Sequence, residues 1–259
     1  GQTVGNAINL SGTGISSGGA IINSNATAAT ISGDITLAAH SSVGGSNAVT
    51  ISGVISGAYN LTKVGSSTYT LSNTNTYTGD TTISAGTLKL TGNLNSATDL
   101  VIASGATLDL QAALTAATLD LDGTISNTAG TSSLVISGTS SLGGSVTTTS
   151  TQTYTGAATL TGNSTLTTSS AQVTFSNTIN SEGSETNNLT VTASETEFNG
   201  IIGGTQGIGD ITLTGTLDLN AAINDASSLS VSSTSNLGAN VTTSGTQTYT
   251  GATTLSGGD

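Results

Sequence analysis

Short triplets of apolar, polar and apolar residues recur along the chain and predict β-strands. Leu88-Lys89-Leu90 and Leu108-Asp109-Leu110 are typical examples. Alternation with a period of two places the apolar side chains on one face of a strand. Clusters of Gly, Asn and Ser separate the triplets and favour turns. No segment keeps the i, i+3, i+4, i+7 apolar spacing of an amphipathic helix, so the sequence predicts an all-β protein.

The triplets return at a regular interval. Four of them start at residues 49, 69, 88 and 108, which gives spacings of 20, 19 and 20 residues. Three short strands and their turns fill about 20 residues. We therefore expect a parallel β-helix, or β-solenoid, with about 20 residues per coil, in which residues 1–259 form a single rod about 60 Å long. A sandwich or an up-and-down barrel is the alternative, but most turns lack the Asn-Gly or Asp-Gly form of hairpins.

This period also predicts which side chains are neighbours on adjacent coils. Val49, Tyr69, Leu88 and Leu108 should form one inward ladder. Lys89 and Asp109 should face outward, one coil apart, as a cross-coil ion pair. Opposite charges on stacked strands contribute about 0.2–1 kcal/mol at an exposed position.

Longer internal repeats accompany the coil period. Residues 134–162 align without gaps to residues 229–257, and the phrase Thr-Tyr-Thr-Gly occurs three times. Self-similarity on this scale is typical of repeat proteins. We expect the three tyrosines to occupy one equivalent position at a coil corner, where each ring covers a core of small residues. The alternative makes them exposed platforms for sugars. The phrase residues are Tyr77, Gly79, Tyr154, Gly156, Tyr249 and Gly251.

Composition narrows the range of functions. The chain has no Pro, Cys, Met or Trp, and its net charge is −12 with only two cationic side chains. Phosphate neutralisation needs clustered cations, so nucleic acid is not expected as a partner. No apolar run approaches the length that spans a bilayer, so no membrane insertion of this segment is expected. Absence of Cys excludes a disulfide scaffold and thiolate metal sites.

No catalytic constellation is recognisable. The single histidine, His40, is expected in a turn, and no Ser-His-Asp arrangement can be built on it. Carboxylates in pairs could cleave glycosidic bonds, but we expect these carboxylates to point outward from Leu-Asp-Leu strands as a solvated face. The candidates are Asp109, Asp120, Asp122 and Asp218.

Two further polar features are candidates for ligand binding. The densest acidic cluster consists of Glu182, Glu185, Glu195 and Glu197. We expect it in a loop between strands, as an acidic loop rather than a calcium site. Thr147, Thr149, Thr151, Thr153 and Thr155 alternate in a way that could order water or bind ice, although alternation arises easily in a Thr-rich chain. The sequence thus predicts no catalytic residue, no metal and no cofactor.

Residues 61–92 carry a more specific signal. Leu61, Lys63, Gly65, Leu71, Asn75, Tyr77, Gly79, Thr81, Gly86 and Leu88 match the phrase of a known repeat. Ser67, Tyr69 and Asn73 depart from it. The segment resembles the passenger-associated β-strand repeat of autotransporter proteins. This resemblance implies a right-handed β-helix in a large bacterial protein that is exported to the cell surface.

The resulting hypothesis is a non-enzymatic, extracellular structural or adhesive module of a bacterial surface protein, such as a stalk or an adhesin. Its partner would be a host-cell or glycan ligand. The sequence stops within a repeat without a polar cap, which is expected of a fragment of a longer chain or of a filament subunit that associates end to end, and the filament subunit is one alternative function. Another alternative is a polysaccharide-active or glycan-binding β-helix.

Overall fold

The computed structural model describes residues 1–257. It is a parallel β-solenoid of about 12 turns with roughly 20 residues per turn, which confirms the expected fold class. Residues 1–257 contain no α-helix, and one short 3-10 turn, η1, spans Ile15–Ser17. The chain divides into two compact units, residues 1–132 and 133–259. The expectation of one continuous rod stays a prediction.

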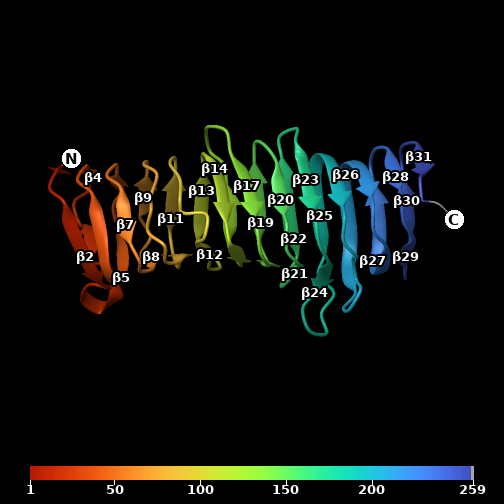
Figure 1. Cartoon of the computed structure of the whole chain (residues 1–259), viewed down its shortest axis with the longest axis horizontal. Coiled ribbons are helices and arrows are strands. Elements are labelled where there is room, and N and C mark those ends of the chain that lie inside the picture. Colours follow the sequence, from red (N-terminus) through yellow and green to blue (C-terminus); the bar gives the residue numbers. More distant parts are fainter. Residues whose placement is uncertain (258–259) are drawn as a thin grey trace. The chain divides into compact units, whose positions relative to one another are not determined.

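In the first unit, strands of successive coils pair in parallel and build columns (Figure 1). One column contains β1 (Thr3–Val4), β4 (Ala29–Ile31), β6 (Val49–Ile51), β9 (Thr68–Leu71), β11 (Thr87–Leu90), β13 (Thr107–Leu110) and β16 (Thr124–Ser126). A second contains β3 (Ile21–Asn23), β5 (Ile35–Gly45), β8 (Leu61–Lys63), β10 (Thr81–Ile83), β12 (Asp99–Ile102) and β15 (Thr118–Leu121). The start of β5 also pairs with β2 (Ile8–Gly12) and β7 (Ile55–Gly57), and β14 spans Ala113–Ala116.

The second unit is built in the same way. We call its first column the groove column: β17 (Ser133–Ile136), β20 (Gln152–Tyr154), β23 (Gln172–Phe175), the ends of β25 (Leu189–Phe198) and β26 (Ile208–Leu219), β28 (Ser235–Leu237) and β31 (Thr253–Leu255). The threonine column contains β19 (Ser145–Thr148), β22 (Ser164–Thr168), the first parts of β25 and β26, β27 (Ile223–Val231) and β30 (Gln247–Tyr249). The remaining strands are β18 (Ser140–Leu142), β21 (Ala158–Leu160), β24 (Ile179–Ser181) and β29 (Val241–Thr243).

The strand register confirms the predicted inward ladder of the first unit. Val49 is paired with Tyr69, Tyr69 with Leu88, and Leu88 with Leu108. All four side chains are buried. From β4 to β16 one coil takes 17 to 20 residues along this column, although the first step, from β1 to β4, takes 27, and along the groove column one coil takes 18 to 23 residues. Uneven loops of the second unit therefore weaken its period in the sequence.

An aromatic stack fills the interior of the second unit. Tyr154 lies against Phe175 with ring centroids 4.9 Å apart and nearly parallel planes, and Phe175 lies 5.7 Å from Phe198. The three rings occupy successive register positions of the groove column, so coil stacking itself brings them together. Stacked aromatic pairs add about 0.5–1.5 kcal/mol to the burial of their area.

The glycine of each Thr-Tyr-Thr-Gly phrase lies against the backbone of the preceding coil. A Cβ atom added at Gly79, Gly156 or Gly251 would lie within 2.3 to 2.5 Å of a backbone atom of that coil. No other residue type fits at such a distance without a shift of the chain. Close packing of consecutive coils therefore requires the glycine of the phrase.

We expect Tyr154→Ala to lower the free energy of unfolding by about 3–5 kcal/mol, because it empties a fully buried site and removes the stack on Phe175. Urea unfolding followed by circular dichroism measures the loss. Tyr249→Ala is the matched control, since Tyr249 lies in the same phrase but is partly exposed. Equal losses in the two variants would contradict the assignment of Tyr154 to the core.

Candidate functional site

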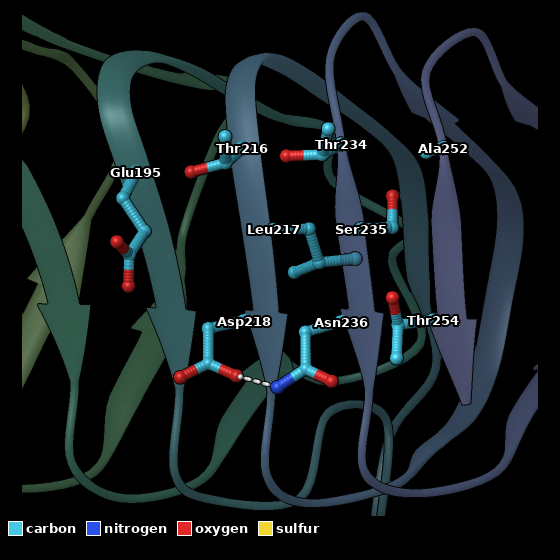
Figure 2. Close-up of a pocket in the computed structure, with 9 residues that line it drawn as sticks. All are labelled: Glu195, Thr216, Leu217, Asp218, Thr234, Ser235, Asn236, Ala252 and Thr254. Atoms are coloured by element: carbon cyan, nitrogen blue, oxygen red, sulfur yellow. Dashed lines mark hydrogen bonds between the residues drawn. The ribbon is translucent and has the colours of Figure 1, made fainter. Parts of the chain in front are cut away.

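A shallow groove of about 450 Å³ lies on the outward face of the groove column. Figure 2 shows the side chains that line it, which come from four consecutive coils. Most of them alternate along each strand with buried residues such as Thr196, which places them on the outside of the sheet, whereas Leu217 and Ser235 line the groove although they are themselves buried. The lining residues are Glu195, Thr216, Leu217, Asp218, Thr234, Ser235, Asn236, Ala252 and Thr254.

Hydrogen bonds from the same coil and from the next coil hold the Asp218 carboxylate of this face. Asn236 Nδ2 donates to Asp218 Oδ1 at 2.9 Å (Figure 2), and Asn220 Nδ2 donates to Asp218 Oδ2 at 3.3 Å. Asn236 is the register partner of Asp218 on the next coil. The coil spacing thus sets the distance over which amide and carboxylate meet.

The same arrangement continues beside the groove, on β23 and β25. Gln172 Nε2 donates to Glu195 and to Glu197, both at 3.2 Å, and the Thr174 hydroxyl donates to Glu197 at 3.2 Å. A line of carboxylates, amides and hydroxyls therefore runs across the strands. Such groups accept and donate hydrogen bonds to a ligand that is rich in hydroxyl groups.

The structure corrects the expectation for the acidic cluster. Glu195 and Glu197 lie within β25 and not in a loop, whereas Glu182 and Glu185 lie in the turn after β24. Thr196 lies between Glu195 and Glu197 and points inward. Because this inward residue is polar, the sequence does not show the apolar–polar alternation of a strand there. Among residues 1–257, no group of three or more His, Cys, Asp or Glu side chains is placed to hold a metal ion.

The other expected carboxylates differ in their surroundings. Asp109 is not a freely solvated side chain, because it is buried and accepts hydrogen bonds from Gln111 Nε2 and from the backbone and hydroxyl of Thr128. Asp120 is exposed in β15 as expected. Asp122 follows that strand instead of lying in it, so the expected position was wrong.

His40 was also misplaced by the sequence analysis. It lies within β5, near the middle of an 11-residue strand, and not in a turn. Its Nδ1 accepts a hydrogen bond from the backbone N–H of Asn60 at 3.2 Å, and its ring meets Tyr59 edge-on at 5.4 Å. Both contacts come from the adjacent coil and give the ring a packing role.

The register places Lys89 of β11 opposite Asp109 of β13. The positions are adjacent on neighbouring coils, as the spacing predicted. The carboxylate of Asp109 accepts its hydrogen bonds from Gln111 and Thr128. Attraction between Lys89 and Asp109 stays a prediction.

The three phrase tyrosines have different surroundings. Tyr77 is buried, and its hydroxyl hydrogen-bonds that of Thr81 at 2.7 Å. Tyr154 donates to Gln152 Oε1 at 3.1 Å, and Tyr249 donates to Gln247 Oε1 at 3.2 Å. Burial raises the pKa of all three phenols. Tyr154 ends a strand of the groove column, Tyr249 ends a strand of the threonine column, and Tyr77 lies outside the strands, so the expected single equivalent position was wrong.

The alternating threonines from 147 to 155 do not form one face. Thr147 lies in β19 of the threonine column, whereas Thr153 lies in β20 of the groove column. The residues between them make the connection from one strand to the other. This stretch alone therefore offers no flat array.

The sequence analysis missed the most unusual polar residue of the core. Lys63 occupies the inward register position between Val43 and Ile83 and is only 1% exposed. Its ammonium group donates to the carbonyl oxygens of Val64, Gly65 and Ala85 at 2.8, 2.9 and 3.1 Å. The Nζ atom also lies 5.6 Å from the centre of the Tyr69 ring. Strict alternation in Leu61-Thr62-Lys63 was the signal that could have revealed the inward position.

Two further polar residues of the same segment satisfy the backbone from inside. Asn75 is buried; its Oδ1 accepts from the backbone N–H of Ile55, and its Nδ2 donates to the carbonyls of Asn73 and Asn93. The hydroxyl of Tyr69, a residue that departs from the expected repeat phrase, shares its single proton between the carbonyl oxygens of Ile21 and Gly44, at 2.8 and 2.7 Å. Burial raises its pKa to about 12. Buried polar groups that replace missing strand pairs in this way stabilise coil corners.

Lys63, Asn75 and Tyr77 are three buried, hydrogen-bonded side chains of a single segment. Residues 61–90 match the family model of the passenger-associated-transport-repeat. This repeat coincides with the segment that the sequence analysis compared to autotransporter passengers. No curated protein and no solved structure matches the chain. None of the helical structure in residues 1–257 is long and apolar enough to cross a membrane.

We expect Lys63→Met to lower the free energy of unfolding at neutral pH by about 1–3 kcal/mol, because three partly buried carbonyl oxygens lose a charged hydrogen-bond donor. Lys89→Met is the control, since Lys89 is a partly exposed residue at an outward position of a neighbouring strand. A larger loss for Lys89→Met than for Lys63→Met would contradict this role.

The pH dependence gives a second measurement of the same group. Burial lowers the pKa of Lys63 to about 8 from the ordinary value of 10.5. Between these pH values the unfolded chain binds more protons than the folded chain, so the free energy of unfolding rises with pH. Relative to Lys63→Met, the wild type should gain stability from about pH 8 to about pH 10.5, measured by urea titrations at each pH. If the difference in the free energy of unfolding between the wild type and Lys63→Met did not change across this pH range, the lowered pKa would be contradicted.

Proposed function

We propose that this chain is a structural and adhesive module of a bacterial surface protein, exported as part of an autotransporter passenger. The observation that carries the proposal is the match of residues 61–90 to the passenger-associated-transport-repeat, within a β-solenoid of the kind that such a passenger needs. A passenger-like surface protein fits both findings. The adhesive role is a further part of the proposal.

The packing of the repeat suggests how it assists export. Each coil binds the preceding one through parallel strand pairs, as β8 and β10 show. A solenoid can therefore fold by propagation from one coil to the next. Lys63, Asn75 and Tyr77 are buried side chains of a single coil that each form hydrogen bonds with neighbouring residues, so the repeat would provide a stable start for this propagation.

This proposal predicts that one particular coil matters for export. Residues 61–80 are one full coil by register, because Leu61 pairs with Thr81. Deleting them from the full-length protein in its own bacterium should reduce the surface-exposed amount several-fold, measured by protease accessibility on intact cells. Deleting residues 41–60, which are also one coil, is the matched control. Equal export of the two deletion proteins would overturn the special role of the repeat.

Glycan binding in the groove is a second candidate function. It is favoured by the line of carboxylate, amide and hydroxyl groups across β25, β26 and β28, which matches the hydrogen-bonding needs of sugars. Extended surfaces that cross several coils are typical binding sites of solenoid proteins. End-to-end association of copies stays a prediction that no contact described above favours.

Asp218→Ala should weaken binding to a recognised glycan by tenfold or more, since a hydrogen bond to a charged group contributes about 1.5–3 kcal/mol. A glycan array identifies the ligand, and calorimetry measures the change. Asp120→Ala removes an exposed carboxylate from the other unit and should leave binding unchanged. Absence of any glycan ligand for the wild-type chain would remove this candidate.

A further inference from the structure

The threonine column presents two parallel ranks of hydroxyl side chains on its outward face. Strand pairs align the members of each rank from coil to coil. The first rank consists of Ser145, Thr165, Thr190, Thr212, Ser230 and Thr248. The second rank consists of Thr147, Thr167, Thr192 and Thr214.

These side chains point away from the core. They alternate along their strands with Val146, Leu166, Val191 and Leu213, which are all buried. In the part of the chain that the structure describes, the hydroxyls of Thr165, Thr190 and Thr212 make no hydrogen bond to protein, and the same holds for the four threonines of the second rank. Their hydrogen-bonding capacity is therefore free for a ligand or for water.

The uniformity of these ranks exceeds what composition supplies. Ser and Thr make up about a third of the chain, yet they occupy all ten positions. The outward positions of the groove column on the same coils carry Glu197, Asp218 and Asn236 instead. In the first unit, the rank that runs through Thr30, Thr50 and Thr70 continues with the charged residues Lys89 and Asp109.

Charge also distinguishes this face. The chain carries a net charge of −12, but none of the ten positions is charged. The nearest carboxylate along β26 is Asp210, which borders the first rank and accepts a hydrogen bond from the Ser228 hydroxyl at 2.7 Å. An uncharged face on an acidic protein fits an uncharged ligand.

The backbone fixes the spacing of the array in two directions. Neighbouring strands lie about 4.8 Å apart, and residues i and i+2 of one strand lie about 6.6 Å apart. Each position adds a hydroxyl group, and the eight threonines among them add a methyl group. A face with this regularity binds a regular surface better than it binds a single small molecule, which requires converging groups in a concave site.

We propose that the threonine column binds the surface of an ice crystal. Hydroxyl groups at fixed spacing hold first-shell waters in a repeating pattern, and the methyl groups between them restrict the orientation of the adjoining waters. A water layer ordered in two dimensions can join a crystal lattice. This ligand goes beyond the proposed surface role and does not depend on where the chain is located, so the two proposals can fail separately.

The test is ice affinity of the purified chain. A dilute solution is frozen slowly on a cold finger, and the protein concentrations in the ice and in the remaining liquid are compared. Thermal hysteresis of single ice crystals is measured on the same samples. We expect the wild type to enter the ice and to show hysteresis. Exclusion of the wild type from ice, at the level of a non-binding protein, would overturn the proposal.

Two tyrosine variants locate the binding face. Thr212→Tyr places a bulky ring in the centre of the first rank and should abolish both signals. Thr159→Tyr places the same ring at a partly exposed position of β21, on another column of the same unit, and should leave both signals intact. Circular dichroism melts verify that both variants remain folded. Equal loss of the two signals in both variants would overturn the assignment to this face. A second contrary result would be that Thr212→Tyr abolishes binding to an insoluble glycan but leaves ice binding intact.

Discussion

Parallel hydrogen bonding between successive coils is the constraint on which the rest of this structure depends. Once Leu61 pairs with Thr81 and Thr81 with Leu100, each side chain has a fixed neighbour one coil before and one coil after. Period-two alternation then determines which ladders form the core and which face outward. Composition follows from this constraint as well. Proline would remove a donor from a ladder, and the chain contains none.

Coil corners are the places where this hydrogen bonding stops, and polar side chains take its place there. Lys63 and Asn75 donate to backbone carbonyls in the first unit, and Gln152 donates to Val146 and Thr167 carbonyls in the second. Each of these side chains is buried. A hydrogen bond to a charged group contributes about 1.5–3 kcal/mol and a neutral one about 0.5–1.5 kcal/mol, so these few side chains stabilise the corners. The residues that match the passenger repeat are informative because they concentrate this function in one coil.

The sequence predicted the fold well where polar residues face outward and apolar residues face inward. The ladder from Val49 to Leu108 follows this rule, and its register was predicted correctly. The rule failed where a polar residue faces inward. Lys63 was not recognised as buried, and Thr196 concealed the strand that carries Glu195 and Glu197. The groove was invisible for a related reason, since its residues lie up to 59 positions apart and meet only through coils of unequal length.

Unequal coil length has a consequence for the internal repeat. Residues 152–154 pair within the groove column, whereas the matching residues 247–249 pair within the threonine column. In both copies the Tyr hydroxyl donates to the Gln Oε1, and the Gln Nε2 donates to a Val carbonyl and a Thr hydroxyl. The phrase is thus a local unit that fits either column. Because the same phrase occurs in both columns, it does not determine which side chains a face presents. The residues at the outward positions of each column determine that. A ladder of hydroxyls on one column and a ladder of carboxylates and amides on the other can then coexist on the same coils, each altered by substitutions that leave the corners unchanged.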